Sequence, residues 1–487
     1  MQEPCGGGQY YFLSRPRRFG KSLLVNTLKE LFEGNEPLFR GLHIHGAWDW
    51  SVQHPVIRLS FGYGHSHDPG YVHMHVLEQL ADIAEAAGVE SPRETGPGRL
   101  ADLIRRLHRR SAHGMDVLVD ECDKPIPVAL EEPEVARANR DFLRGLYAVF
   151  EECDEEIRFT FITGVSKFSK VSLFSGLNNL EDITLDPLYS SICGYTEADL
   201  DEVFAPQMRG LDREEIRRWY NGYSWLGGEC VYNQFDILLL LKKRAFKPYW
   251  VETCTPKFLP ELLFRRRVSS LDLERMAGDE ELLSKFDVGE VGTEALLFKT
   301  GHLTITGKER SGWKTRYQLG YPNLEVRLAL NARLHSEMVP EESWRVADHT
   351  KLGNLLAAGD LAGLKAKLRA VFASIPSDWH RWNRIARYEG YYAAVVHAWF
   401  TAQELDVVAE DSGSGGRADM VVPHPNAVYV FGFKVAETAR QGTALAQVKA
   451  GGYAVKHLGQ GRPVYLVGVE FGSESRNVER FDSERIQ

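Results

Sequence analysis

The sequence of 487 residues is poor in cysteine, and it has no long apolar run and no excess of positive charge. Its six cysteines are scattered without a C-x-x-C pair, which argues against a disulfide framework and against a zinc cluster. No apolar stretch is long enough for a membrane helix, so we expect no membrane contact. The formal net charge of −9 provides no general basic field, so nucleic-acid binding would require a local patch. These absences, with no signal peptide before residue 10, predict a soluble cytoplasmic protein.

The length and the pattern of apolar residues predict three domains, two of them of α/β type. A chain of this length exceeds what one hydrophobic core supports. Apolar strands alternate with amphipathic helices over residues 10–190, which predicts a parallel sheet. We therefore expect a nucleotide-binding domain at residues 1–205. A helix-rich region at 206–345, either a winged-helix-like lid or connector or a plain helical spacer, leads to a second α/β domain at 346–487.

A phosphate-binding loop (P-loop) is predicted between a short apolar strand, Tyr10–Leu13, and an apolar-periodic helix that begins at Gly20. That order of strand, loop and helix is what a P-loop requires. Backbone N–H groups and the helix dipole favour an anion at a helix N-terminus. Lys21 would reach the outer phosphates of ATP, and the Ser22 hydroxyl would ligate Mg²⁺. An ordinary helix start with a solvated lysine is the alternative.

The loop departs from the spacing G-x-x-x-x-G-K-[ST] at one position, because Arg15 stands where the first glycine belongs. Arg15, Arg17 and Arg18 suit either a phosphate-facing loop or a solvated turn, and the sequence does not separate these roles. We count Arg15 and Gly20 among the expected nucleotide-binding residues.

Acidic and polar residues follow two further strands of the predicted sheet. One apolar strand ends in Asp120 and Glu121, and another ends in Thr163. Asp120 can hold the Mg²⁺ shell, Glu121 can polarise the attacking water, and Thr163 can sense the outer phosphate. Ligands of open α/β sheets bind at strand ends, so we expect these residues near the phosphate loop. The alternative for the two acidic residues is an ordinary cap of a strand-to-loop junction.

Several motifs together resemble the prokaryotic AAA-ATPase-like family. They lie at residues 11–22, 119–125, 161–168, 191–197, 219–225 and 319–325. The resemblance covers nearly the whole chain and implies an ATP-binding domain coupled to a C-terminal nuclease domain of the PD-(D/E)xK superfamily. Many members resemble parts of mobile-element or defence systems. The chain departs from the family in three places, one of them in the nuclease domain. In the ATPase domain, members usually carry a further stretch before the loop, so we expect weaker nucleotide retention, and Cys122 stands where tyrosine is usual.

The C-terminal part has the α-β-β-β-α-β order of these nucleases, an α/β restriction-endonuclease-like fold. Asp419 ends one strand, and residues 432 and 434 project to one face of the next, because side chains repeat every two positions. The reaction needs carboxylates for Mg²⁺ and a lysine for the water and the phosphate. Asp419 is the expected metal ligand, with Lys434 and the helix-borne Glu389 beside it. Gly432 stands where glutamate is expected, which predicts impaired cleavage or a plain buried β-pair.

Two functions remain open from the sequence. The first is an ATP-hydrolysing enzyme with Glu121 as a catalytic residue. Its nuclease-fold domain, with Glu389, Asp419 and Lys434, would act on DNA or RNA. The second is a non-catalytic nucleotide-dependent switch whose C-terminal domain only docks nucleic acid or a protein partner. ATP and Mg²⁺ are the expected cofactors, and a second copy of the chain is a further candidate partner.

Overall fold

The computed structural model describes residues 9–62, 69–111, 113–126, 132–164, 177, 179–254, 258–266, 268, 270–279, 292–312, 314–338, 349–375, 389–413, 416–436, 443–452, 454–459 and 461–487. The chain divides into two compact units, and each is described by itself. The first unit is Met1–Trp250 with Met276–Asn323, and the second is Val251–Arg275 with Leu324–Gln487. Within the described residues, no helix combines the length and the hydrophobicity that crossing a bilayer requires.

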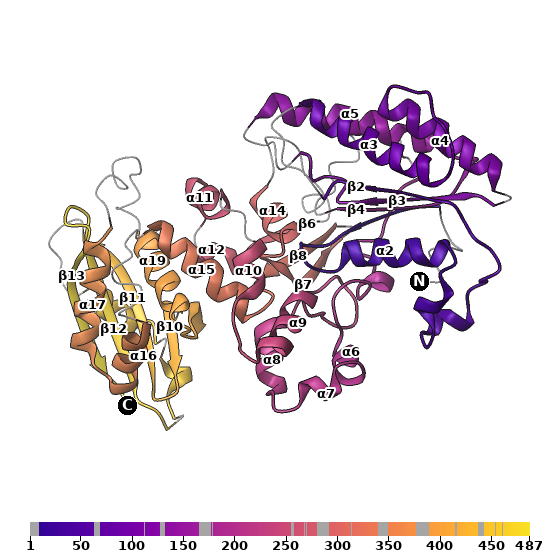
Figure 1. Ribbon diagram of the computed structural model, residues 1–487. Coiled ribbons are helices and arrows are strands. Elements are labelled where there is room, and N and C mark those ends of the chain that lie inside the picture. The colour runs from indigo at the N-terminus through magenta and orange to yellow at the C-terminus, as the bar shows by residue number, and fades with distance from the viewer. Residues whose placement is uncertain are drawn as a thin grey trace. The chain divides into compact units, whose positions relative to one another are not determined.

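The first unit contains a five-stranded sheet whose neighbouring strands all run parallel, in the order β2-β3-β4-β1-β5. Its strands are β1 (Tyr10–Ser14), β2 (Val56–Ser60), β3 (Met115–Asp120), β4 (Ile157–Gly164) and β5 (Glu181–Asp182). The flanking helices are α2 (Lys21–Phe32), α3 (Pro69–Ala86), α4 (Gly96–Arg110) and α5 (Pro133–Glu152), with 3₁₀ turns η1 (Glu36–Phe39) and η2 (His43–Gly46). Figure 1 shows α2 on one face of the sheet and α3 to α5 on the other. The central strands are buried along their length because helices cover both faces, and the predicted parallel α/β sheet is confirmed.

The strand register places the predicted polar residues at one edge of this sheet. Leu13 of β1 pairs with Thr163 of β4, and Val119 of β3 pairs with Ile162. Asp120 and Thr163 are the next residues on their strands, so they lie side by side. β4 lies between β1 and β3, and its end therefore separates the phosphate loop from Asp120.

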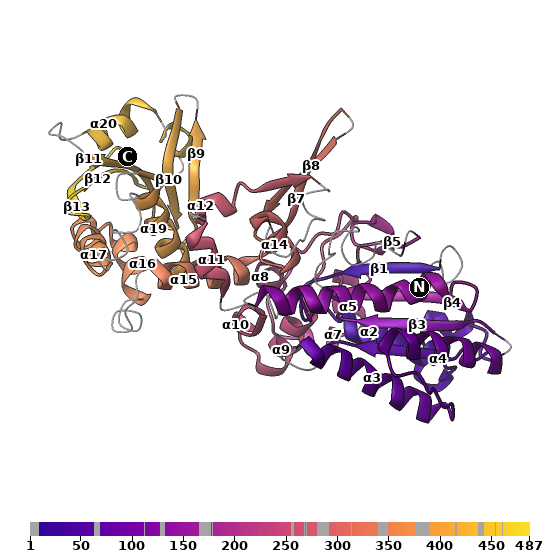
Figure 2. The same cartoon turned by 90° about the horizontal axis from the view of Figure 1, so that it is seen from above.

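Short helices and a small antiparallel sheet complete the first unit. They are η4 (Pro187–Tyr189), α6 (Glu197–Glu202), α7 (Ala205–Met208), α8 (Arg213–Tyr220), α9 (Gln234–Lys243), α14 (Thr293–Lys299), β6 (Ala277–Asp279), β7 (Thr304–Ser311) and β8 (Lys314–Gly320). The strands are ordered β6-β8-β7, and Figure 2 shows β7 and β8 as a projecting hairpin. α10 (Tyr249–Cys254) spans the boundary between the units. The region expected at 206–345 contributes to both units, and its boundaries stay a prediction.

The second unit is built on a mixed five-stranded sheet in the order β13-β12-β11-β10-β9. Its strands are β9 (Val408–Gly413), β10 (Gly416–His424), β11 (Ala427–Ala436), β12 (Val464–Gly472) and β13 (Val478–Arg485). Its helices are α11 (Phe258–Arg265), α12 (Ser270–Leu273), α15 (Leu324–Met338), α16 (His349–Ala358), α17 (Leu361–Ala373), α19 (Glu389–Ala402) and α20 (Thr443–Ala450), with the 3₁₀ turn η6 (Val455–His457). β11 and β12 run parallel and the other pairs antiparallel. The order α19-β9-β10-β11-α20-β12 confirms the predicted nuclease-like fold.

Alternating residues of the second sheet face two separate cores. Phe431 and Phe433 pack with residues of α16, α17 and α19 in the larger core. Val430 packs with Val448 of α20 in the smaller one. Residues 432 and 434 therefore lie on the face that α20 covers, because side chains of a strand alternate.

Candidate functional site

The loop after β1 ends in a glycine whose backbone few other residues adopt. Gly20 has φ of 82° and precedes the first residue of α2, as the N-cap. That left-handed conformation carries a steric cost for residues with a Cβ. Lys21 follows and is buried, whereas Ser22 is exposed. The loop therefore presents a helix N-terminus, an amine and a hydroxyl at consecutive positions.

The Lys21 amine lies inside the loop. It donates hydrogen bonds to the carbonyl oxygens of Arg15 at 2.8 Å and Pro16 at 3.0 Å. Burial lowers the pKa of Lys21, and the negative charges of Glu121, Asp123 and Asp120 oppose that shift. The charges of the acidic residues at and after the end of β3 thus favour the charged form of Lys21.

Two of those acidic residues have distinct surroundings. Asp120 is buried and accepts a hydrogen bond from the Thr163 hydroxyl at 2.9 Å. Glu121 has φ of 55°, and its carboxylate lies 3.0 Å from the Lys124 amine. Lys124 also donates to the carbonyl of Gly62, beyond the end of β2. Asp120 is therefore fixed on the sheet, whereas Glu121 is held by a neighbouring cation.

Sequence reasoning assigned no role to Asp123, although it lies in the same acidic segment. Its side chain is buried, and a Cβ at Gly164 would lie 2.7 Å from its Oδ1 atom. Asp123 therefore sits at the end of β4, beside Thr163. The sequence signal that could have identified Asp123 is that it is the third acidic residue within four positions, after Asp120 and Glu121.

Arg15 occupies the loop, but its guanidinium contacts the protein backbone. It donates to the carbonyls of Ser14 at 2.9 Å, Thr184 at 2.9 Å and Tyr189 at 3.0 Å. It also lies 4.3 Å from the ring centroid of Trp225, and burial lowers its pKa to about 10. Arg15 therefore joins the loop to residues 184–189, and its expected contact with phosphate stays a prediction.

We call residues 223–250 the loop clamp, because Tyr223, Phe235 and Trp250 contact residues 17–19 of the loop. Phe19 is buried, and its ring centroid lies 4.7 Å from that of Tyr223, edge to face. The indole of Trp250 donates to the Arg17 carbonyl at 2.9 Å. Arg18, with φ of 68°, lies over the ring of Phe235. Sequence reasoning missed this packing, although the aromatic motif 219–225 was recognised.

In the second unit, Asp419 lies where β10 stops pairing with β11. Met420 pairs with Phe431, and the pairing continues only toward the hairpin turn. The carboxylate of Asp419 accepts a hydrogen bond from the Phe433 backbone N–H at 2.7 Å. Asp419 is thus positioned beside the face that carries Gly432 and Lys434.

The place of the expected carboxylate at Gly432 is occupied by α20. A Cβ at Gly432 would collide with a Cγ methyl of Val448 and would lie 3.9 Å from Oδ2 of Asp419. On β12, Gly468 pairs with Gly432 and would collide with Leu445 in the same way. Two facing glycines therefore allow α20 to approach the sheet closely.

Another carboxylate lies near this face, which the sequence did not single out. Glu470 pairs in register with Lys434, is buried, and accepts a hydrogen bond from the Ala444 N–H at 3.1 Å. It therefore contacts the start of α20. Glu389 is the first residue of α19, and its side chain lies outside what the structure describes. Among the described residues, no three histidine, cysteine, aspartate or glutamate side chains are grouped to hold a metal ion.

The donor groups of the two sites differ in how well they suit the expected cofactors. In the first unit a helix N-terminus with a lysine and a serine follows β1, and a buried aspartate ends β3; donors of these types suit a triphosphate with Mg²⁺. In the second unit the position of one expected ligand is filled by Val448. The described residues there do not make a complete metal site.

Comparison with known proteins also distinguishes an N-terminal ATPase-like part from a C-terminal nuclease-like part. Residues 5–174 match the family described as Predicted AAA-ATPase, and residues 387–481 match the PD-(D/E)XK nuclease superfamily. The chain is 52% identical over 479 residues to the "Uncharacterized protein in vnfD 5'region" of Azotobacter chroococcum mcd 1. The match covers 98% of this chain and 93% of that protein. The chain belongs to the predicted AAA-ATPase family, with a C-terminal domain of the PD-(D/E)XK nuclease superfamily.

Proposed function

We propose that the chain binds ATP with Mg²⁺ at the loop before α2 and hydrolyses it. The observation that carries this proposal is that the buried Lys21 follows the left-handed Gly20 at the start of α2, while the buried Asp120, hydrogen-bonded by Thr163, lies at the end of β3 in the same sheet. Lys21 would hold the outer phosphates, and Ser22 and Asp120 would hold Mg²⁺, which offsets the charge of the phosphates. Thr163 fixes the orientation of Asp120. Glu121 would orient the attacking water.

In this proposal the C-terminal domain docks DNA or RNA and cleaves it slowly or not at all. Asp419 and Lys434 remain on one face, but Val448 fills the place of a side chain at residue 432. Loss of one metal ligand weakens a metal site severely. Lys434 still attracts a phosphate, so docking can persist without cleavage.

Substitution of Lys21 tests the nucleotide site. Lys21→Ala should weaken binding of labelled ATP about 10- to 100-fold, because a charged hydrogen-bond donor is lost. Lys29→Ala is the matched control, since Lys29 lies on the same helix but pairs with Glu33 at 2.6 Å. Equal binding of ATP by both variants would refute the assignment.

A second candidate function is a nucleotide-dependent switch without hydrolysis. The contact between Glu121 and Lys124 favours it, because an ion-paired carboxylate is not free to orient water. The two functions differ in turnover: a switch retains ATP without releasing phosphate.

A further inference from the structure

The carboxamide of Gln234 lies directly against the phosphate loop. A Cβ at Gly20 would collide with its Oε1 atom and would lie 2.9 Å from its Cδ atom. Glycine at position 20 therefore serves two purposes: it adopts the left-handed backbone conformation, and its lack of a side chain leaves space for the carboxamide of Gln234. The amide nitrogen of Gln234 donates to the Gly194 carbonyl at 3.4 Å, which is beyond the usual length of such a bond. The carboxamide oxygen is therefore the atom nearest the loop, and the weakly engaged amide nitrogen lies beside it, 3.2 Å from the same Cβ position.

Backbone contacts hold Gln234 at this place. It is the first residue of α9, and the buried Asn233 caps that helix through the Phe235 N–H at 2.9 Å. Just before it, Tyr232 pairs with Tyr195 through two backbone hydrogen bonds of 2.8 and 3.0 Å. The position of the carboxamide is therefore set by the segment from residue 195 and by the start of α9.

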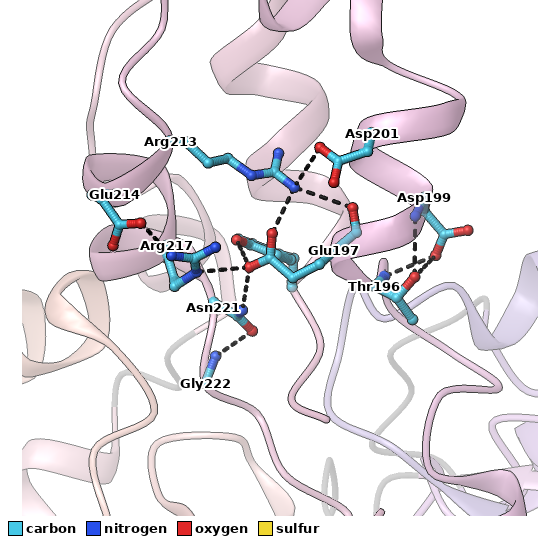
Figure 3. Close-up of polar contacts among 10 residues, drawn as sticks. Thr196, Glu197, Asp199, Asp201, Arg213, Glu214, Arg217, Asn221 and Gly222 are labelled. Carbon is cyan, nitrogen blue, oxygen red and sulfur yellow. Dashed lines mark hydrogen bonds and ion pairs between the residues drawn. The ribbon is translucent and has the colours of Figure 1, made fainter. Parts of the chain in front are cut away.

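Glu197 anchors that segment through four hydrogen bonds. Its carboxylate accepts from Arg213 at 2.6 Å, Arg217 at 2.9 Å and Asn221 at 3.1 Å (Figure 3). It also accepts from the Tyr232 hydroxyl at 2.6 Å. Burial alone would raise the pKa of Glu197, but the bonds from Arg217 and Tyr232 and the charges of the two arginines lower it to about 2. The carboxylate is ionised at neutral pH and fixes the residues that precede Gln234.

We propose that Gln234 is a nucleotide-binding residue whose carboxamide N–H donates to the phosphate chain of a bound nucleoside triphosphate. The contact replaces the long hydrogen bond to Gly194, and it ties the start of α9 to the occupied loop. An uncharged amide adds a donor without adding a further buried cation to Lys21 and Arg15. This assignment rests on the proposed ATP binding and extends it to Gln234 of the loop clamp.

Two substitutions at residue 234 test the contact in the full-length chain. Gln234→Met keeps the length of the side chain without the donor and should weaken ATP binding about fivefold to tenfold. Gln234→Glu places a negative charge beside the phosphates and should weaken ATP binding further. Gln207→Glu is the control, because Gln207 is exposed on α7 and adds the same charge. Isothermal titration with ATP and with ADP gives the affinities.

Melting temperatures separate contact from structural support. Substitution of a residue that contacts ATP reduces the rise in Tm that ATP produces. Substitution of a purely structural residue lowers the Tm of the protein without nucleotide. A larger loss for ATP than for ADP places the contact on the terminal phosphate, and equal losses place it on the inner ones. If both variants bind ATP like the parent while Lys21→Ala does not, Gln234 makes no such contact. Absence of ATP binding by the unmodified chain would overturn this assignment together with the proposed function.

Discussion

The guanidinium of Arg15 lies 4.3 Å from the ring centroid of Trp225, and both side chains are buried. A buried guanidinium is costly unless hydrogen bonds and an aromatic face compensate for its lost hydration. Carbonyls on three residues supply the bonds, and Trp225 supplies the face. Two segments about 200 residues apart in the sequence thereby stabilise one conformation of the phosphate loop.

Trp225→Ala should therefore destabilise the first unit and disturb its loop. Truncating a buried tryptophan costs about 3–5 kcal/mol, and here it also uncovers a buried charge. Thermal unfolding should show a lower Tm, and ATP binding should weaken with it. Trp225→Phe keeps an aromatic face and should retain most of both. Parent-like stability of Trp225→Ala would show that the ring does not support the loop.

The parts of the site that follow from strand order could be predicted from the sequence. Carboxyl ends of parallel strands meet at one edge, so an apolar strand ending in Asp120 and another ending in Thr163 belong beside the loop. The structure places these two side chains 2.9 Å apart. Likewise, nearly continuous apolar runs predicted β1 to β4 of the first sheet, because buried parallel strands have that pattern.

Side-chain directions set by distant segments could not be predicted in this way. The sequence left open whether Arg15 belongs to a phosphate-facing loop or to a solvated turn, because its direction depends on residues 184–189 and on Trp225. From the sequence, Gly432 was interpreted as the loss of a metal-binding glutamate. The structure shows in addition that a side chain there would collide with Val448. Period and propensity carry no information on such contacts.

Glu121→Gln should bind ATP like the parent but release phosphate about 100-fold more slowly, because a group that orients water is lost. Phosphate release and ATP affinity are measured on the same preparation. Unchanged turnover would remove Glu121 from the catalytic residues.

Lys124→Ala is the companion variant for that measurement. It frees Glu121 from its ion pair at 3.0 Å. Faster phosphate release would show that Lys124 restrains the carboxylate, as the switch function requires.

Glu197→Gln should weaken the loop clamp in a pH-dependent manner. The pKa of Glu197 is lowered from 4.5 to about 2 in the folded chain, so its stabilisation is fully present above pH 4.5. It is lost as the pH falls from 4.5 toward 2. The parent should exceed the variant by ~1–2 kcal/mol at neutral pH, allowing for solvent screening, and the difference should shrink in that acidic range.

Denaturant unfolding at several pH values measures this difference. Glu214→Gln is the matched control, because Glu214 also pairs with Arg217 but its side chain is 78% exposed. A difference for Glu197→Gln that stays constant down to pH 2 would contradict the ionised anchor.

The nuclease-fold domain should bind metal tightly only in a variant that has a carboxylate at residue 432 and a smaller side chain at residue 448 to make room for it. Gly432→Glu adds a carboxylate near Asp419, but its Cβ collides with Val448. Overpacking of this kind costs about 1–3 kcal/mol, so the single variant should unfold at a lower temperature and bind Mn²⁺ weakly. Gly432→Glu with Val448→Ala removes the colliding methyl groups.

The double variant should bind Mn²⁺ more tightly than the parent and should nick plasmid DNA in its presence. Val448→Ala alone is the control for the cavity, and it should do neither. Mn²⁺ electron paramagnetic resonance reports binding independently of cleavage. Brisk metal-dependent cleavage by the unmodified chain, abolished by Asp419→Ala, would show instead that another carboxylate completes the site. In that case Glu470 is the first residue to substitute, because it pairs with Lys434 across the neighbouring strand.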